Sequence, residues 1–273
     1  MPTRFLSRLL LLASLAPLAA QAQAVISTGQ SFVSARLLPG AQAPGDERMA
    51  GLELTLVDGW KTYWRSPGET GVPPSFDWSG SRNLKSAEVL WPRPELIEAF
   101  GSTTVGYAHQ VTLPLRLVPE DPGRPMQVRL KADLGVCREL CVLEEIRLDE
   151  TIAPGETDGA EQVARAIEAV PVNAAASGLT DARCRVVGAG PERRLEAVLS
   201  FAHQLSAPVV LVEGPETAWI GDTEATARGG ELTVSATVEM LEADAWIDRR
   251  DLRLTVLDGP FAADIRGCAP PGD

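Results

Sequence analysis

Apolar and polar residues alternate along much of the chain between residues 31 and 152. The segment MQVRLKADL, residues 126–134, places every second residue on an apolar face and polar residues on the other face. The segment GLELTLVDG repeats this pattern with Leu52, Leu54 and Leu56. A period of two is typical of half-buried β-strands, and the segments rich in Pro and Gly between them mark turns. We therefore predict an antiparallel β-sandwich.

The pattern changes at residues 153–180. The segment APGETDG is rich in residues that break regular structure, and AEQVARAIEAV then predicts one short helix that ends before Pro171. Beyond it, LEAVLSFA, APVVLVEG, ELTVSATVEM and DLRLTVLDG again have the pattern of strands. We predict an all-β protein with two β-sandwich domains, residues 25–152 and 181–273, joined by a short helical linker at residues 153–180.

Residues 1–24 have the pattern of a secretory signal peptide. Two arginines precede an apolar run at residues 9–18, and small residues follow, so cleavage is expected after Ala22 or Ala24. The apolar run is shorter than the roughly 20 residues that a membrane span needs. We expect the mature protein to be soluble and exported to the periplasm.

The chain is acidic, with 25 Lys and Arg against 37 Asp and Glu and a formal net charge of −12. Residues 1–24 hold two arginines and no acid, so their removal leaves 23 bases against 37 acids, a charge of −14. Proteins that bind nucleic acid need basic surface to neutralise phosphates. Nucleic acid is therefore not an expected partner, and the acidity indicates solubility.

Four cysteines allow three disulfide connectivities in an oxidising compartment, and neighbouring pairs are the simplest choice. Cys184 and Cys268 flank the predicted second domain. A disulfide between them would close a long loop and remove about 4.6 kcal/mol of unfolded-state freedom on the chain-entropy model. We expect a structural disulfide there. Two free thiols or a second redox pair are the alternatives.

Cys137 and Cys141 have only three residues between them, so the same model gives about 2 kcal/mol for their disulfide. The flanking segments predict a β-hairpin with the pair at its tip, where facing residues are about 4.5 to 5.5 Å apart, close enough for a disulfide. Redox exchange is the favoured reading. A purely structural disulfide is the second reading. Metal binding is the third, since zinc takes four ligands and the only histidines, His109 and His203, belong to separate predicted domains.

Four segments together resemble the N-terminal periplasmic domain of the DsbD and ScsB thiol-disulfide reductases. They are GWKTYWRSPGETGVPPSFDW, WPRPE, GYAHQVTLPL and CRELC followed by VLEE. The resemblance implies an immunoglobulin-like sandwich, and a second one in the longer ScsB type. It implies that Cys137 and Cys141 are the redox-active pair and that no cofactor is needed. The expected partners are a membrane-embedded thiol reductase of the DsbD/CcdA type and periplasmic proteins that contain disulfides or are thioredoxin-like.

The resemblance also implies a cap that shields the pair until a partner docks. Phe100 matches the aromatic residue of the cap loop, Tyr107 matches an aromatic residue in the next block, and Glu98 is the acid that precedes Phe100. The chain departs from the family where Gly101 replaces an aromatic residue and where three residues, instead of five, separate the cysteines. It also ends without a membrane channel, so we expect its electrons to come from a separate protein.

The sequence therefore predicts a component of a protein-disulfide reductase. The resemblance implies Cys141 as the site of the mixed disulfide and Cys137 as the resolving thiol. Glu139, Glu144 and Glu145 would oppose thiolate formation, whereas Arg138 would favour it. The process served, such as cytochrome c assembly, copper tolerance or disulfide repair, is left open. The alternative is a non-catalytic binding or assembly module that keeps the hairpin disulfide as a fixed clip.

Overall fold

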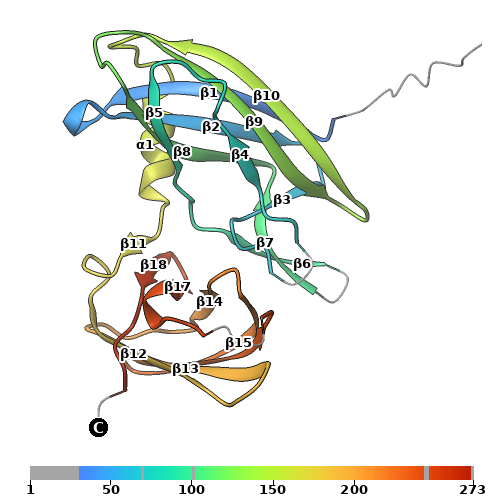
Figure 1. The fold of residues 1–273 in the computed structure, drawn as a ribbon, viewed down its shortest axis with the longest axis vertical. Helices are drawn as coiled ribbons and strands as arrows, with labels where there is room; N and C mark the ends of the chain where they lie inside the picture. The colour runs from blue at the N-terminus through green and yellow to red at the C-terminus, as the bar shows by residue number, and fades with distance from the viewer. Residues whose placement is uncertain (1–30, 69–70, 100–101, 243–245, 272–273) are drawn as a thin grey trace, which may run out of the picture. The chain divides into compact units, whose positions relative to one another are not determined.

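A computed structural model describes residues 31–68, 71–99, 102–242 and 246–271. The predicted signal peptide and Phe100 lie outside these ranges. Within them, the chain is almost entirely β-structure, with one α-helix between two β-regions (Figure 1). The predicted all-β fold class, with two immunoglobulin-like sandwiches and a short helix between them, is confirmed, while the exact domain boundaries stay a prediction.

The first sandwich consists of two antiparallel sheets. One sheet has the strand order β1 (Val33–Gln42), β2 (Arg48–Leu56), β8 (Gln110–Pro119) and β5 (Leu84–Val89). The other has the order β10 (Cys141–Ile152), β9 (Met126–Cys137), β3 (Lys61–Tyr63), β7 (Ser102–Ala108) and β6 (Glu95–Ala99), and β4 (Ser75–Asp77) also pairs with β9. A short 3₁₀ helix, Pro44–Asp46, connects β1 and β2.

Alternation along the strands builds the first core. In β9 the apolar face predicted from the sequence, from Met126 to Leu134, is at most 4% exposed. Leu52, Leu54 and Leu56 of β2 are likewise buried. These side chains join one hydrophobic cluster with the fully buried Trp64. The pattern that predicted the strands therefore also predicted which faces meet.

The helix between the sandwiches, α1 (Ala160–Glu168), is fixed to the first sandwich. Its buried residue Val163 packs against Gly51 of β2, where an added Cβ atom would lie only 2.9 Å from the Val163 side chain. Gln162 donates hydrogen bonds to the buried Glu53 and, at 2.9 Å, to Thr112. The sequence predicts this helix as a linker; the structure adds that one face of it covers β1, β2 and β8.

The second sandwich also has two sheets, and each of them has four strands. The first has the order β12 (Leu179–Val187), β13 (Glu192–Phe201), β16 (Glu231–Met240) and β15 (Ala218–Arg228). The second has the order β11 (Val172–Asn173), β18 (Phe261–Arg266), β17 (Arg253–Asp258) and β14 (Val209–Glu213), with a 3₁₀ helix at Arg249–Asp251. All pairs are antiparallel except β11 with β18. The enclosed cluster of buried side chains is separate from that of the first sandwich.

Cys184 and Cys268 form a disulfide with a Cα–Cα distance of 5.7 Å. It joins β12 to the segment after β18, where Cys184 N–H donates to the Ala269 carbonyl and Ala269 N–H donates to the Ala182 carbonyl. Cys184 is 2% exposed and belongs to the second core. The bond therefore ties the last described segment of the chain to the opposite sheet, and its purely structural role stays a prediction.

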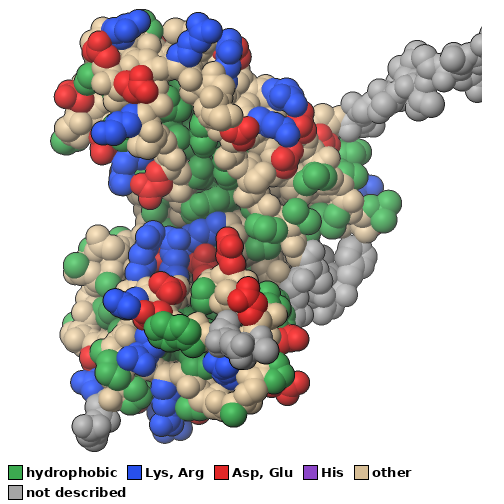
Figure 2. Space-filling model, viewed as in Figure 1, with side chains coloured by type: hydrophobic (Ala, Val, Ile, Leu, Met, Phe, Trp, Pro, Cys, Tyr) green, Lys and Arg blue, Asp and Glu red, His purple; other side chains and the backbone are tan. Residues whose placement is uncertain are grey.

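None of the helices in the described part of the chain is long and apolar enough to cross a membrane. On the face shown in Figure 2, acidic and basic side chains lie interspersed. The acidity of the chain is therefore not gathered into one patch on that face.

Replacing both Cys184 and Cys268 by Ala should lower the free energy of unfolding by about 3 to 5 kcal/mol, because the unfolded chain regains the freedom of an 84-residue separation. Urea unfolding of the oxidised proteins measures this loss. The Cys137→Ala/Cys141→Ala variant is the control, and its loss should be about 2 kcal/mol or less. Equal losses in the two variants would contradict a structural role for the long-range bond.

Candidate functional site

The tip of the β9–β10 hairpin carries the Cys137–Cys141 disulfide. The two cysteines face each other as the last residue pair of the two strands, with a Cα–Cα distance of 4.1 Å. Arg138, Glu139 and Leu140 close the tip, where Arg138 N–H donates to the Leu140 carbonyl at 3.1 Å. The predicted hairpin and its disulfide are confirmed.

The two cysteines differ in exposure. Cys137 is 2% exposed, whereas Cys141 is an exposed residue beside the exposed Leu140. The β9 strand is paired on both sides at this end, with β10 and with β3, while β10 lies at the edge of the sheet. Cys141 is therefore the more accessible of the two sulfurs, and Cys137 is the buried one.

Tyr63 contacts the disulfide through its hydroxyl group. The oxygen lies 2.9 Å from Cys137 Sγ and 3.4 Å from Cys141 Sγ. Since a disulfide sulfur carries no hydrogen, the tyrosine hydroxyl is the donor. Burial raises the pKa of Tyr63 above its ordinary value, so the hydroxyl stays protonated at neutral pH. The site thus holds a fixed hydrogen-bond donor beside the buried sulfur.

Two glycines make room for the ring of Tyr63. A Cβ atom at Gly135 of β9, or at Gly71 after β3, would lie 2.9 Å from atoms of this ring. Thr62 next to it is 1% exposed and donates a hydrogen bond of 2.9 Å to the Gly135 carbonyl. One edge of the ring therefore lies close to Gly135 of β9, and the hydroxyl reaches the sulfur two residues further along that strand.

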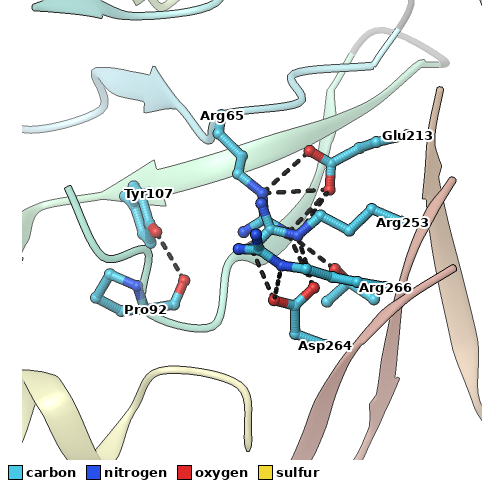
Figure 3. Close-up of polar contacts among 8 residues, drawn as sticks. Arg65, Pro92, Tyr107, Glu213, Arg253, Asp264 and Arg266 are labelled. Atoms are coloured by element: carbon cyan, nitrogen blue, oxygen red, sulfur yellow. Dashed lines mark hydrogen bonds and ion pairs between the residues drawn. The ribbon is translucent and has the colours of Figure 1, made fainter. Parts of the chain in front are cut away.

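Tyr107, predicted as a shielding residue, lies on the other face of the sheet. It pairs with Thr62, which in turn pairs with Val136, and all three are buried. Cys137, one residue further along β9, faces the opposite side. The Tyr107 hydroxyl donates to the Pro92 carbonyl at 2.7 Å (Figure 3), and burial holds the pKa of Tyr107 well above its ordinary value. Tyr107 thus supports the sheet beneath the site, and a direct shielding role does not follow from this position.

Glu98, another residue of the predicted cap, lies in β6. It is exposed and accepts a hydrogen bond of 2.6 Å from Thr103, its partner in β7. This bond joins β6 to β7. Phe100 itself lies outside the described residues, so its role in shielding stays a prediction.

Acidic residues near the cysteines are engaged elsewhere. Glu139 pairs with Arg138 at 3.1 Å. Glu145 pairs with Lys131 and Arg147, which lowers its pKa through hydrogen bonds and charge. These contacts weaken the argument from sequence that the acids oppose thiolate formation.

Glu144 accepts hydrogen bonds from the backbone N–H of Phe32 and the hydroxyl of Ser31. A basic residue also lies next to the disulfide. Lys61 of β3 is the strand partner of Cys137, and its ammonium group donates a hydrogen bond of 2.9 Å to the Thr104 hydroxyl. The local charge at the site is therefore more balanced than the count of acids in the sequence indicated.

Within the described ranges, no group of three or more His, Cys, Asp or Glu side chains could hold a metal ion. The groups that the structure brings together at the hairpin tip are the two sulfurs and the hydroxyl of Tyr63. The sequence analysis singled out both cysteines but assigned no role to Tyr63. The signal that could have found it is Gly135, because a glycine inside a strand often marks the close approach of another group.

Two family models match separate parts of the chain. Residues 34–153 match the family model described as "Thiol:disulfide interchange protein DsbD, N-terminal". Residues 169–269 match a model described as "Domain of unknown function (DUF8393)". No protein with a curated description matches the chain.

Among solved structures, the crystal structure of the N-terminal periplasmic domain of ScsB from Proteus mirabilis is similar, with a TM-score of 0.71 and 24% sequence identity. The alignment covers 88% of this chain and 94% of that chain. The likeness shows a shared fold. The family match confirms the predicted resemblance for residues 34–153 and supports a module of the thiol-disulfide interchange type there.

Replacing Gly135 by Ala should lower the free energy of unfolding by about 1 to 3 kcal/mol, because the added methyl group overpacks the ring of Tyr63. Thermal or urea unfolding measures the change. Gly123→Ala is the matched control, since a Cβ there has only one neighbour, a side-chain oxygen of Asp121 at 3.4 Å. A Gly135→Ala protein as stable as this control would show that the ring is not held against β9.

Proposed function

We propose, from the match of residues 34–153 to the DsbD N-terminal family, that the protein is a periplasmic thiol-disulfide interchange module. It passes two electrons from a membrane-embedded reductase of the DsbD/CcdA type to exported proteins that contain disulfides or are thioredoxin-like. The observation that supports this most strongly is the asymmetry of the disulfide. Cys141 is exposed at the hairpin tip, and Cys137 is buried against the Tyr63 hydroxyl.

Reduction of the module begins when a thiolate of the reductase attacks Cys141 Sγ. A bond forms between the two sulfurs, the Cys137–Cys141 bond breaks, and Cys137 leaves as a thiolate with the electron pair. The second thiolate of the reductase then attacks the first reductase sulfur, which is bonded to Cys141 Sγ in the mixed disulfide. Cys141 is released as a thiolate, the reductase becomes a disulfide, and the module has gained two electrons.

Delivery to a substrate reverses these steps. The Cys141 thiolate attacks a substrate disulfide, and one substrate sulfur leaves as a thiolate that takes up a proton. Cys137 then attacks Cys141 Sγ, which re-forms the hairpin disulfide and releases the second substrate sulfur as a thiol. The substrate gains two electrons and two protons in total, so the cycle needs no cofactor.

Tyr63 assists the half of each cycle in which Cys137 is anionic. Its hydroxyl already lies at hydrogen-bond distance from Cys137 Sγ in the disulfide. A hydrogen bond to a thiolate is stronger than one to a neutral sulfur, because the acceptor carries the charge. The donor therefore stabilises Cys137 as a leaving group and keeps it as a thiolate for the resolving attack.

A fixed structural clip is the alternative role for this disulfide. Because the loop is short, the disulfide adds only about 2 kcal/mol to the free energy of unfolding on the chain-entropy model. A purely structural disulfide also does not require that one of its sulfurs be exposed to solvent. Both features favour exchange. The second sandwich holds its own disulfide between residues 84 positions apart, which suits a structural role better.

The two cysteines should react at different rates when each is alone. With excess oxidised glutathione, the Cys137→Ala protein should form a mixed disulfide at Cys141 at least about tenfold faster than the Cys141→Ala protein forms one at Cys137, because exposure limits attack. Mass spectrometry follows the added glutathione over time.

The wild-type protein, fully reduced, is the control, and it should return to the disulfide without accumulating the adduct. No adduct on either single-cysteine protein within hours would overturn the proposed function. Faster modification of Cys137 would overturn the assigned order of the two sulfurs.

A further inference from the structure

Arg65 of the first sandwich is bound by side chains of the second. Its guanidinium donates hydrogen bonds of 2.9 to 3.2 Å to the Glu213 carboxylate and one of 2.9 Å to the Thr255 hydroxyl (Figure 3). Asp264 lies at 4.0 Å. The Arg65 side chain is only 10% exposed, and Thr255 is fully buried. This is a specific, nearly dry contact for a charged side chain.

The second sandwich holds this set of acceptors in place by itself. Arg253 pairs with Asp264 at 2.6 Å and lies 3.9 Å from Glu213, its partner residue in the pairing of β14 with β17. Thr255 pairs with Asp264 across β17 and β18. Burial acts to raise the pKa of Asp264, but the arginines outweigh it and leave the pKa below its ordinary value. Glu213, Thr255 and Asp264 therefore form a preformed polar site on one face of the sheet.

Arg65 lies two residues after Tyr63, just beyond the end of β3. The β3 strand is three residues long and pairs with β9 through Lys61 and Thr62 and with β7 through all three residues, and Trp64 N–H donates to the Val105 carbonyl at 3.0 Å. Tyr63 is its last residue. Beyond it, Trp64 is buried in the first core, and the Arg65 guanidinium lies 3.6 Å from the centre of the Trp64 ring. The next pairing with β9 begins only at Ser75.

We propose that Arg65 is a positioning residue, through which the second sandwich holds the end of β3 and so keeps the Tyr63 hydroxyl against Cys137. This inference rests on the proposed function and deepens it. A hydrogen bond weakens steeply once its atoms move beyond their normal distance, so a small shift of β3 removes the donor from the sulfur. The second sandwich thereby sets the reactivity of a disulfide that it does not contain.

A double-mutant cycle tests this coupling. The rate of reduction of the disulfide by glutathione is measured in the whole protein for wild type, Tyr63→Phe, Glu213→Gln and the double variant. Tyr63→Phe should slow reduction by about tenfold, as expected for loss of a hydrogen bond to a charged group. Glu213→Gln should slow it by roughly threefold or more. The double variant should be no slower than Tyr63→Phe alone, because Glu213 acts through Tyr63.

The pH dependence of the reduced pair gives a second readout that a merely structural role would not move. Thiolate absorbance in Glu213→Gln should titrate at higher pH than in wild type, and in the Tyr63→Phe background the substitution should have no further effect. Glu196→Gln, which breaks an exposed ion pair with Arg185 in the same sandwich, is the matched control and should behave as wild type. If Glu213→Gln fails to fold, Thr255→Val, which removes a single hydrogen bond to Arg65, takes its place.

The outcomes separate this inference from the proposed function. A Glu213→Gln protein that reacts like wild type and Glu196→Gln, or effects of Glu213→Gln and Tyr63→Phe that multiply, would overturn the coupling while leaving the exchange reaction intact. A wild-type protein that glutathione does not reduce at all would overturn the proposed function, and the coupling with it.

Discussion

The register between β9 and β10 is the constraint on which the site depends. It places Cys137 directly opposite Cys141 at the last pair of the hairpin, so the disulfide forms with no rearrangement of the backbone. The same register sends residues 126–136 of even number into the core and leaves the cysteines on the other face. A slip of one residue would exchange the faces and turn the apolar residues away from the core, onto the face that now carries the disulfide. Core packing therefore maintains the geometry of the redox pair.

The position of β3 beside β9 makes the two sulfurs of this disulfide unequal in exposure. Because β3 covers one side of Cys137 while β10 remains at the edge of the sheet, one sulfur is buried and the other is open to a partner. The ring of Tyr63, packed against Gly135, brings a protonated hydroxyl to the buried sulfur. Arg65 then links this segment to the second sandwich, whose own disulfide and core give it an independent frame.

Local pattern predicted much of this, and the rest depends on contacts between distant residues. Alternation predicted the buried face of β9, and the spacing of the cysteines predicted the hairpin tip, because both are properties of neighbouring residues. The contact of Tyr63 with Cys137 joins residues 74 positions apart, and that of Arg65 with Glu213 joins residues 148 apart. Local pattern also did not indicate that the acids beside the cysteines form ion pairs and hydrogen bonds with other groups, or that the strand pairing turns Tyr107 toward the core.

The proposed function requires that the hairpin disulfide opens and closes under the conditions of its compartment. Its reduction potential can be measured by equilibrating the protein in glutathione buffers and counting the thiols at residues 137 and 141 by alkylation and mass spectrometry. We predict a value above about −300 mV, the range of exchangeable disulfides, with the Cys184–Cys268 bond below it in the same sample. A hairpin disulfide that lies below this value and stays oxidised beside the Cys184–Cys268 bond would overturn the proposed function.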